Sequence, residues 1–211
     1  MINKNILKKE ELLNSNFNNE FRGRLIFVRP ICNEQITDKY VSWLNDKSLN
    51  QYLEVRHQKQ NLRTVTKYIN SLRKKPNCDM FVIFKKKDRQ HIGNLTITSF
   101  NHNNSGELSF GLMIADEDSR RRGIGGEMHL ILLEFAFSFK EINRVTASAA
   151  SDNKIACRTL ESVGYKVDGI SINEFPLKSG EKCNVNHYIM LRDKWNKRKQ
   201  DLKYLKYIQI Y

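Results

Sequence analysis

Hydrophobic residues recur along this chain at two spacings, and each spacing predicts a different kind of element. Apolar positions three and four residues apart predict helices near residues 37–44, 61–75, 124–140 and 153–163. The helix over 124–140 carries apolar residues on most of its sides, so we expect it to be buried on much of its circumference. Gly164 directly follows the last of these helices, where a glycine commonly ends a helix.

Short runs of β-branched and aromatic residues predict the strands between these helices. The runs cover residues 24–30, 80–84, 92–98, 107–115, 144–149, 165–172 and 185–191. In chain order, the elements mix antiparallel hairpins with two strand–helix–strand units, which predicts one α/β domain over residues 23–194. A polar extension over residues 1–22, with one helical turn near Ile6–Leu13, precedes it. A basic amphipathic tail over residues 195–211 follows it.

A basic, glycine-rich turn joins the predicted strand 107–115 to the long helix. It reads Arg120-Arg121-Arg122-Gly123-Ile124-Gly125-Gly126. The first turn of a helix carries unpaired N–H groups and a partial positive charge, glycines let an anion approach the backbone, and arginines add charged donors. The turn therefore predicts a phosphate or pyrophosphate site. The glycines alone would equally fit a solvated loop, and neither the Walker sequence nor the dinucleotide G-x-G-x-x-G pattern is present.

Two motifs together resemble the signatures of the GNAT N-acetyltransferase superfamily. The first, R/Q-x-x-G-x-G/A, is matched by Arg120 to Gly125. The second, N-x-x-A/S followed by E-x-x-G-F/Y, is matched by Asn153, Ala156, Glu161, Gly164 and Tyr165. The resemblance covers residues 23–192 and implies a GNAT fold, an α/β fold with a mixed, mostly antiparallel central sheet, flanking helices and a splayed central strand pair. It also implies acetyl-CoA-dependent transfer of an acetyl group to a primary amine.

The same resemblance implies where acetyl-CoA binds. The end of the strand at residues 113–115 would pair with the pantetheine arm, and the backbone amides of residues 121–126 would bind the pyrophosphate. Residues of the second motif would border the rest of the cofactor. The expected set is Met113, Ile114, Ala115, Arg120, Arg121, Arg122, Gly123, Ile124, Gly125, Gly126, Asn153, Ala156 and Arg158. No metal is implied.

Amine chemistry sets the demands on the catalytic residues. A primary amine is mostly protonated at neutral pH, so a base must remove a proton directly or through water. Glu107 begins the strand that leads to the cofactor and resembles a carboxylate found there in related enzymes; alternatively, it is a solvent-facing residue at a strand end. Many family members carry a general-acid tyrosine where this chain has Leu160, so that acid is absent or supplied elsewhere. Tyr165 is taken as catalytic together with Glu107, and Tyr188 and Ser148 are further candidates.

Three more segments are similar to one branch of the superfamily, which contains ribosomal-protein N-terminal, polyamine and nucleotide-linked amino-sugar acetyltransferases. They are W-L-N-D at residues 43–46, Y-L-E-x-R at 52–56 and H-I-G-N at 91–94. The combination is most similar to the amino-sugar members. In that fold the segment after the first helix borders the acceptor pocket, so Tyr52, Glu54 and Arg56 are the expected acceptor-binding residues.

The charge balance narrows the choice of acceptor. The chain of 211 residues carries 36 Lys and Arg against 23 Asp and Glu, a net charge of +13, and such a surface attracts anions. It suits a nucleotide-linked amino sugar together with acetyl-CoA, and it would repel cationic polyamines. The second hypothesis is an acetyltransferase for the N-terminus of a ribosomal or other protein. A nucleic-acid-binding protein fits the charge, but the sequence has no RNA or DNA motif, so nucleic acid is not the expected partner.

Composition excludes several other classes. No run of about 18 apolar residues exists, so no membrane-spanning helix is expected. The first residues show no secretory signal. Neither the four cysteines nor the five histidines have metal-ligand spacing, which favours free thiols in a reducing cytoplasm and no metal site. We therefore expect a cytoplasmic enzyme with a small-molecule amine as its partner, and a homodimer is left open.

Overall fold

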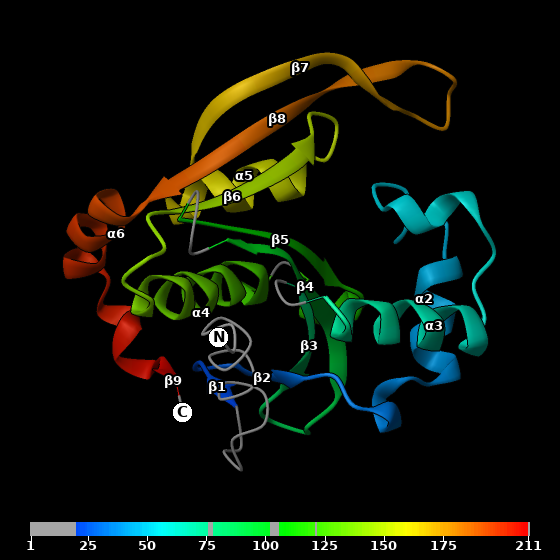
Figure 1. The fold of residues 1–211 in the computed structure, drawn as a ribbon, viewed down its shortest axis with the longest axis horizontal. Helices are drawn as coiled ribbons and strands as arrows, with labels where there is room; N and C mark the ends of the chain where they lie inside the picture. The colour runs from blue at the N-terminus through cyan, green and yellow to red at the C-terminus, as the bar shows by residue number, and fades with distance from the viewer. Residues whose placement is uncertain (1–19, 76–77, 102–105, 121, 211) are drawn as a thin grey trace, which may run out of the picture.

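The strands of this chain form one mixed sheet, around which the helices are arranged (Figure 1). The computed structural model describes residues 20–75, 78–101, 106–120 and 122–210. Within these ranges, nine strands lie in the order β7-β8-β6-β5-β4-β3-β2-β1-β9. Every neighbouring pair is antiparallel except β5 and β6. The helical turn expected near Ile6–Leu13 lies outside the described residues.

The elements follow the predicted order along the chain. The strands are β1 (Phe21–Arg22), β2 (Ile26–Pro30), β3 (Asp79–Lys85), β4 (His91–Asn101), β5 (Glu107–Ile114), β6 (Arg144–Ala150), β7 (Lys166–Pro176), β8 (Lys182–Leu191) and β9 (Gln209–Ile210). The helices are α2 (Asp38–Asn45), α3 (Leu62–Arg73), α4 (Ile124–Ser138), α5 (Lys154–Val163) and α6 (Arg192–Arg198). Short 3-10 turns are η1 (Asn33–Gln35), η2 (Glu54–His57), η3 (Glu117–Ser119), η4 (Lys199–Asp201) and η5 (Lys203–Tyr207). The short strands β1 and β9 and helix α6 were not expected.

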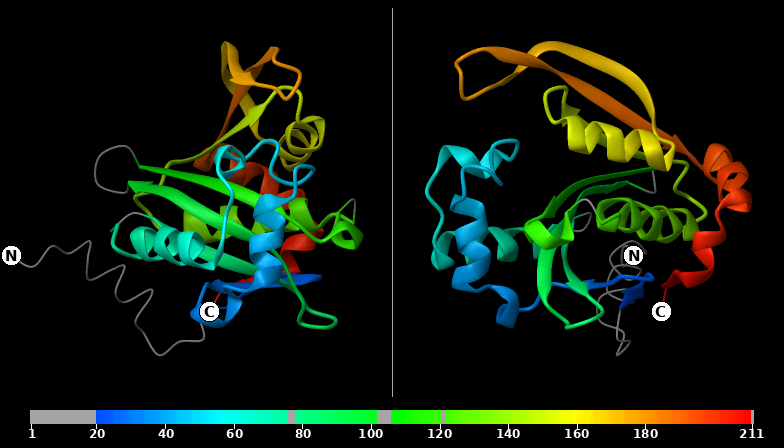
Figure 2. Two further views of the ribbon diagram at one scale, coloured as in Figure 1. Left: turned by 90° about the vertical axis from the view of Figure 1, so that its right-hand side faces the viewer. Right: turned by 180° about the vertical axis from the view of Figure 1, so that it is seen from behind.

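Alternate residues of the central strands face two hydrophobic cores, one on each side of the sheet. On β3, Phe81 and Ile83 belong to the core that α4 and α5 cover, whereas Met80, Val82 and Phe84 belong to the core under α2 and α3. Figure 2 shows the two helix pairs separated by the sheet. This alternation follows from the two-residue period of a strand, and it makes β3 apolar on both faces.

β5 and β6 pair over only three residues on each strand. Glu107, Leu108 and Ser109 of β5 lie opposite Arg144, Val145 and Thr146 of β6. The registered pairing ends there, although β5 continues to Ile114 and β6 to Ala150. The strands therefore leave a gap within the sheet. The expected mixed, mostly antiparallel sheet with flanking helices and a splayed central pair is confirmed.

A buried carboxylate connects α4 to the N-terminal edge of the sheet. Glu127 is almost fully buried, and its Oε1 accepts hydrogen bonds from the backbone N–H of Leu25 at 2.8 Å and of Ile26 at 3.3 Å. A Cβ on Gly23 would lie 1.9 Å from that oxygen, so this close approach requires glycine. The β1–β2 turn is thereby held against the first turns of α4.

The C-terminal tail is packed into the fold. Trp195 on α6 has no exposed surface, and its Nε1 donates to Oε1 of Glu134 at 2.7 Å. Arg192 donates at 2.7 Å to the carbonyl oxygen of Phe137, one of those that the end of α4 leaves free, and at 2.9 Å to that of Ile142 in the loop that follows. Farther on, β9 pairs with β1. The predicted boundary at residue 194 therefore falls within α6, a helix that packs on the core.

Two buried polar side chains on the α4 side of the sheet have atoms without a hydrogen-bond partner among the described residues. They are Nδ1 of His129 on α4 and the hydroxyl of Tyr165, which precedes β7. Their rings lie 5.6 Å apart, and both pack against Phe110 of β5. Burial lowers the pKa of His129 to about 4, because an imidazolium ion would lose its hydration there. Burial also raises the pKa of the Tyr165 hydroxyl.

We predict that His129→Leu makes the protein less sensitive to acid. The folded-state pKa of His129 lies below its ordinary value of 6.5, so the unfolded chain takes up a proton that the folded chain does not between pH 6.5 and 4. Stability is therefore lost as the pH falls through that window. Between pH 7.5 and 5 the wild type should lose about 2 kcal/mol more unfolding free energy than the variant. Denaturant unfolding at both pH values measures this difference.

A second buried histidine, His91, does not disturb this comparison. Burial also lowers the pKa of His91 to about 4, and because that residue is present in both proteins, its contribution cancels. Equal losses in wild type and variant would show that His129 is protonated in the folded protein.

Candidate active site

The gap between β5 and β6 is the first component of the site. Beyond Ser109, the edge of β5 that faces β6 has no strand partner, so its backbone groups are available to an extended ligand. Phe110, Leu112 and Ile114 are half-buried and pack on the α4 side. Gly111 is exposed, and no atom lies within 4 Å of the position that a Cβ would take. Residues 110–114 therefore combine an apolar wall with a free backbone edge.

The glycine-rich turn lies where β5 leads into α4. Gly123 is the N-cap of α4 with φ of +80°, a left-handed conformation that favours glycine. No atom lies within 4 Å of a Cβ built on Gly123 or Gly126, and one on Gly125 would make only ordinary contact with Thr159 at 3.6 Å. Ile124 is buried and anchors the turn. The N-terminus of α4 is thus an open cradle, and the N-terminus of a helix is a type of site that can bind an anion such as a phosphate.

The three arginines before the cradle differ in position. The Nε of Arg120 donates to the carbonyl oxygen of Ile114 at 3.1 Å, and its Nη2 donates to that of Ala115 at 2.9 Å. Arg120 therefore supports the end of β5. Arg122 is exposed beside the cradle, and Arg121 lies outside the described residues. The side chains of Met113 and Ala115 pack on the α2–α3 core, so only the backbone of this segment faces the gap.

The second motif lies against the first. Asn153 is the N-cap of α5, and its Oδ1 accepts a hydrogen bond from the N–H of Ala156 at 3.2 Å. Ala156 packs on the core, whereas Arg158 is exposed. Thr159, the next residue, is the one that a side chain on Gly125 would contact. The two motifs, 27 residues apart, therefore meet at the start of α4.

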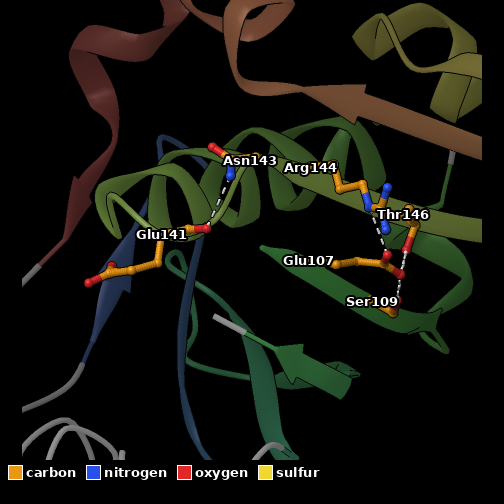
Figure 3. A network of polar contacts seen from close by, with 6 residues as sticks. All are labelled: Glu107, Ser109, Glu141, Asn143, Arg144 and Thr146. Atoms are coloured by element: carbon orange, nitrogen blue, oxygen red, sulfur yellow. Dashed lines mark hydrogen bonds and ion pairs between the residues drawn. The ribbon is translucent and has the colours of Figure 1, made fainter. Parts of the chain in front are cut away.

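Glu107 lies at the closed end of the gap, in a network of hydrogen bonds (Figure 3). Its Oε2 accepts a charged hydrogen bond from Nε of Arg144 at 2.8 Å, and its Oε1 accepts from the hydroxyls of Thr146 at 2.9 Å and Ser109 at 3.0 Å. Burial opposes ionisation, but the bonds from Thr146, Ser109 and Arg144 outweigh it and hold the pKa of Glu107 below its ordinary value. The residue is therefore a carboxylate at neutral pH.

The other catalytic candidates lie on both faces of the sheet. Tyr165 is buried on the α4 side, and the hydroxyl of Tyr188 donates to Oε1 of Glu161 at 3.1 Å. Ser148 of β6 is exposed on the opposite face, and its Oγ lies 2.9 Å from Nδ1 of His187. The other ring nitrogen of His187 lies 2.8 Å from Oγ of Ser171, so the imidazole is held between two hydroxyls. No sequence motif marks His187, because only the β6–β8 register places it opposite Ser148.

The three expected acceptor residues lie in or just before η2, and two of them, Tyr52 and Arg56, contact Phe175 of β7. The hydroxyl of Tyr52 donates to Oδ2 of Asp152 at 3.0 Å, and the guanidinium carbon of Arg56 lies 4.3 Å from the ring centroid of Phe175. Burial and the bond to Asp152 raise the pKa of Tyr52 to about 12. The Glu54 side chain is 88% exposed, with an oxygen 3.8 Å from Nη1 of Arg56. This set connects the α2 layer to the open end of β6.

Among the residues that the structure describes, no group of three or more His, Cys, Asp or Glu side chains is placed to hold a metal ion. No helix in the described part of the chain is long and apolar enough to cross a membrane.

Comparison with protein families identifies this arrangement of gap and cradle. Residues 24–166 match the family model of the acetyltransferase (GNAT) domain. The chain belongs to the GNAT acetyltransferase family. The GNAT domain match includes both glycine motifs and ends at Lys166, the first residue of β7, so helix α6 and the rest of the tail lie outside it.

Individual relatives are distant. An N-acetyltransferase 9-like protein of Nematostella vectensis is 27% identical over 132 residues, which is 63% of this chain and 57% of that protein. The match therefore spans little more than half of that relative's length.

Solved structures that share the fold of this GNAT domain include two in complex with CoA. Spermidine N-acetyltransferase from Vibrio cholerae, in complex with CoA and spermine, aligns over 82% of this chain and 98% of its own, with a TM-score of 0.72 and 16% identity. A ribosomal L7/L12 α-N-protein acetyltransferase in complex with CoA aligns over 81% and 96%, with a TM-score of 0.71 and 16% identity. At this identity the likeness concerns the fold alone.

Proposed function

We propose that this protein is an acetyl-CoA-dependent N-acetyltransferase that acts on a primary amine. The observation that carries the proposal is the open cradle of Gly123 and Gly126 next to the unpaired edge of β5. A phosphate-binding turn and a backbone edge that accepts an extended arm match the two halves of CoA. When bound, acetyl-CoA supplies the activated thioester. The chain binds and orients it, and no covalent intermediate with the protein is required.

The residues of the gap take up the roles that this chemistry requires. Amides of the α4 N-terminus bind the pyrophosphate, and the β5 backbone near residues 110–114 aligns the arm. A backbone N–H of the same segment stabilises the oxyanion that forms on the thioester carbonyl. Arg120 lies in the turn and holds it against the end of β5, because its guanidinium donates to the carbonyl oxygens of Ile114 and Ala115.

We assign proton removal to Glu107, acting through water. Its carboxylate stays ionised, and it lies on the strand that aligns the cofactor, at the closed end of the gap. The bonds from Thr146 and Ser109 orient it, and both come from the face of the sheet that Ser148 shares. Tyr165 is the proposed acid for the departing thiolate, because its hydroxyl is without a partner among the described residues and its ring packs on Phe110.

For the acceptor we propose a nucleotide-linked amino sugar. The net charge of +13 favours an anionic acceptor. Arg56, one of the expected acceptor-binding residues, packs on Phe175 of the β7–β8 hairpin and adds a positive charge there. The second candidate acceptor is the N-terminus of a protein, which supplies a primary amine but carries no phosphate group. This second candidate is supported by the shared fold with the L7/L12 acetyltransferase.

Acetyl-CoA should stabilise the wild-type protein, and Gly126→Ala should reduce that effect. At about 100 times its dissociation constant, a ligand that binds only the folded state adds about 2.7 kcal/mol. Alanine at position 126 meets no atom of the protein and favours the helix by up to about 1 kcal/mol, but its methyl group enters the cradle. The variant should therefore melt higher without ligand and shift less with acetyl-CoA.

Thermal melts with and without millimolar acetyl-CoA measure both effects. Ser71→Ala on α3 is the control, because it changes helix propensity far from the cradle. An unchanged ligand shift in Gly126→Ala would place the pyrophosphate elsewhere, and no shift in the wild type would contradict the proposed activity.

A panel of amines identifies the acceptor. The protein is incubated with acetyl-CoA and, in turn, a nucleotide-linked amino sugar, the same sugar without its nucleotide, a peptide with a free N-terminus, and spermidine. Released thiol reports the rate. We expect the nucleotide-linked sugar to exceed the free sugar by roughly 10-fold or more in kcat/KM, because charged hydrogen bonds to phosphate contribute about 1.5–3 kcal/mol. Turnover of the peptide alone would replace this acceptor by a protein N-terminus.

Glu107→Gln should lower kcat by about 10²- to 10⁴-fold and leave acetyl-CoA affinity nearly unchanged. Glutamine keeps the acceptor for Thr146 and Ser109 but cannot take a proton. If the proton leaves through water, the loss should sit at the low end and shrink as pH rises, because more of the amine is then unprotonated. A pH–rate profile for both proteins with one acceptor measures this.

Arg144→Gln is the matched control for this test, because it breaks the same ion pair and keeps the carboxylate. It should raise the pKa of Glu107 and retain most of the rate. Equal losses of kcat in the two variants would show that the Glu107–Arg144 ion pair has a structural role. Superimposable pH–rate profiles for wild type and Glu107→Gln would show that Glu107 takes no part in the reaction.

A further inference from the structure

A row of two hydroxyls and an imidazole crosses three strands on the face of the sheet opposite α4. Nδ1 of His187 on β8 lies 2.9 Å from Oγ of Ser148 on β6, and Nε2 lies 2.8 Å from Oγ of Ser171 on β7. The strand register places Ser148 opposite His187 on one side and Gly169 opposite it on the other. The ring therefore reaches a hydroxyl with each of its nitrogens. We call this set the Ser148–His187–Ser171 row.

Ser148 is the end of the row that borders the gap. The register between β5 and β6 ends at Thr146, and the next residue, Ala147, packs in the core under α4. Ser148 is therefore the first residue of β6 beyond the pairing whose side chain lies on the opposite face, and it is exposed. Thr146, its neighbour on that face, donates to Glu107. The row thus begins next to the carboxylate assigned to proton removal, where the gap opens.

The row can hold His187 in either of its protonation states. A neutral imidazole has one donor nitrogen and one acceptor nitrogen, whereas an imidazolium ion has two donors. A serine hydroxyl can donate or accept, so both hydrogen bonds persist when the ring gains a proton. Within the described residues, His187 makes no ion pair with a carboxylate that would hold the ring in its charged form. The imidazole can therefore gain and lose a proton without losing a hydrogen bond.

Acetyl transfer to an ammonium group requires two proton acceptors. The nitrogen loses two protons as its bond to the acetyl carbon forms. The C–S bond of the thioester breaks, and the sulfur leaves with the electron pair and gains one proton. One proton is therefore released to solvent in each turnover. Glu107 accounts for the proton that the ammonium group loses before the attack, and the second proton leaves the nitrogen after the attack.

We propose that the Ser148–His187–Ser171 row takes this second proton. The inference rests on the proposed function and adds a proton acceptor to it. Ser171 accepts from Nε2, which leaves Nδ1 free to receive. Oγ of Ser148 takes the proton from the nitrogen of the tetrahedral intermediate and passes its own proton to Nδ1 of His187. The imidazolium ion then loses that proton to water after the product leaves. Ser148 contacts the reacting nitrogen, and His187 acts through it.

The first test is His187→Gln, which keeps a donor and an acceptor in the row but cannot carry a proton. The acceptor is a nucleotide-linked amino sugar, or a peptide with a free N-terminus if the sugar is not turned over. We expect kcat to fall by about 10²-fold, the lower end of the range for a general base. The KM for the acceptor and the rise in Tm with acetyl-CoA should stay close to the wild-type values. Ser71→Ala, at an exposed serine on α3, is the control.

Two further comparisons separate proton transfer from a structural role. Ser148→Thr keeps the hydroxyl and suits a strand, so it should retain kcat within a few-fold, whereas Ser148→Ala should lose about 10²-fold. His187→Ala removes the ring. Free imidazole in the buffer should restore part of its rate, because a small base can occupy the space that the ring leaves, and should not change the wild-type rate.

The outcomes separate this inference from the proposed function. If the wild type acetylates an amine and His187→Gln keeps the full kcat, or only raises the KM for the acceptor, the inference is overturned and the acetyltransferase proposal stands. A loss in His187→Ala that imidazole does not restore would give the ring a structural role and would also overturn the inference. If the wild type neither binds acetyl-CoA nor turns over any amine of the panel, both proposals fail.

Discussion

The short pairing of β5 with β6 is the constraint on which the rest of this structure depends. Three residues on each strand are in register, and the strands then part in the middle of a nine-stranded sheet. An unpaired edge inside a sheet leaves backbone groups without partners, which costs free energy unless water or a ligand satisfies them. The chain leaves β5, forms the glycine turn and α4, and returns as β6. The free edge and the N-terminus of α4 therefore have to lie side by side.

Much of the positive charge has a structural use. Arg120 binds carbonyls at the end of β5, Arg192 binds carbonyls at the end of α4 and in the loop that follows, and Arg198 binds carbonyls at the end of α5. Each guanidinium satisfies acceptors that a terminating element leaves unpaired, and cations at helix C-termini also interact favourably with the helix dipole. Net charge alone thus overstates the attraction for anions, and position decides which arginines remain available to a ligand.

The two sides of the gap differ in chemistry. The α4 side presents glycines and helix N–H groups. The opposite face presents hydroxyls and titratable groups, among them the Glu107 network and the Ser148–His187–Ser171 row. The contact of Tyr52 with Asp152 joins that face to the α2 layer across 100 residues of sequence. Under the proposed function, the cofactor would approach from the α4 side and the amine from the opposite face.

The sequence alone determined the longer strands and four of the helices, the two motifs and hence the family, because periodicity and glycine placement act locally. The helix over 124–140, the cap at Gly164 and the Gly123–Gly126 turn all follow from neighbours within a few positions. Local patterns could not reveal that Arg120 turns back onto β5. Nor could they reveal that Trp195 anchors the tail, or that His187 meets Ser148. Those contacts depend on strand register and helix packing, which bring together residues far apart in the chain.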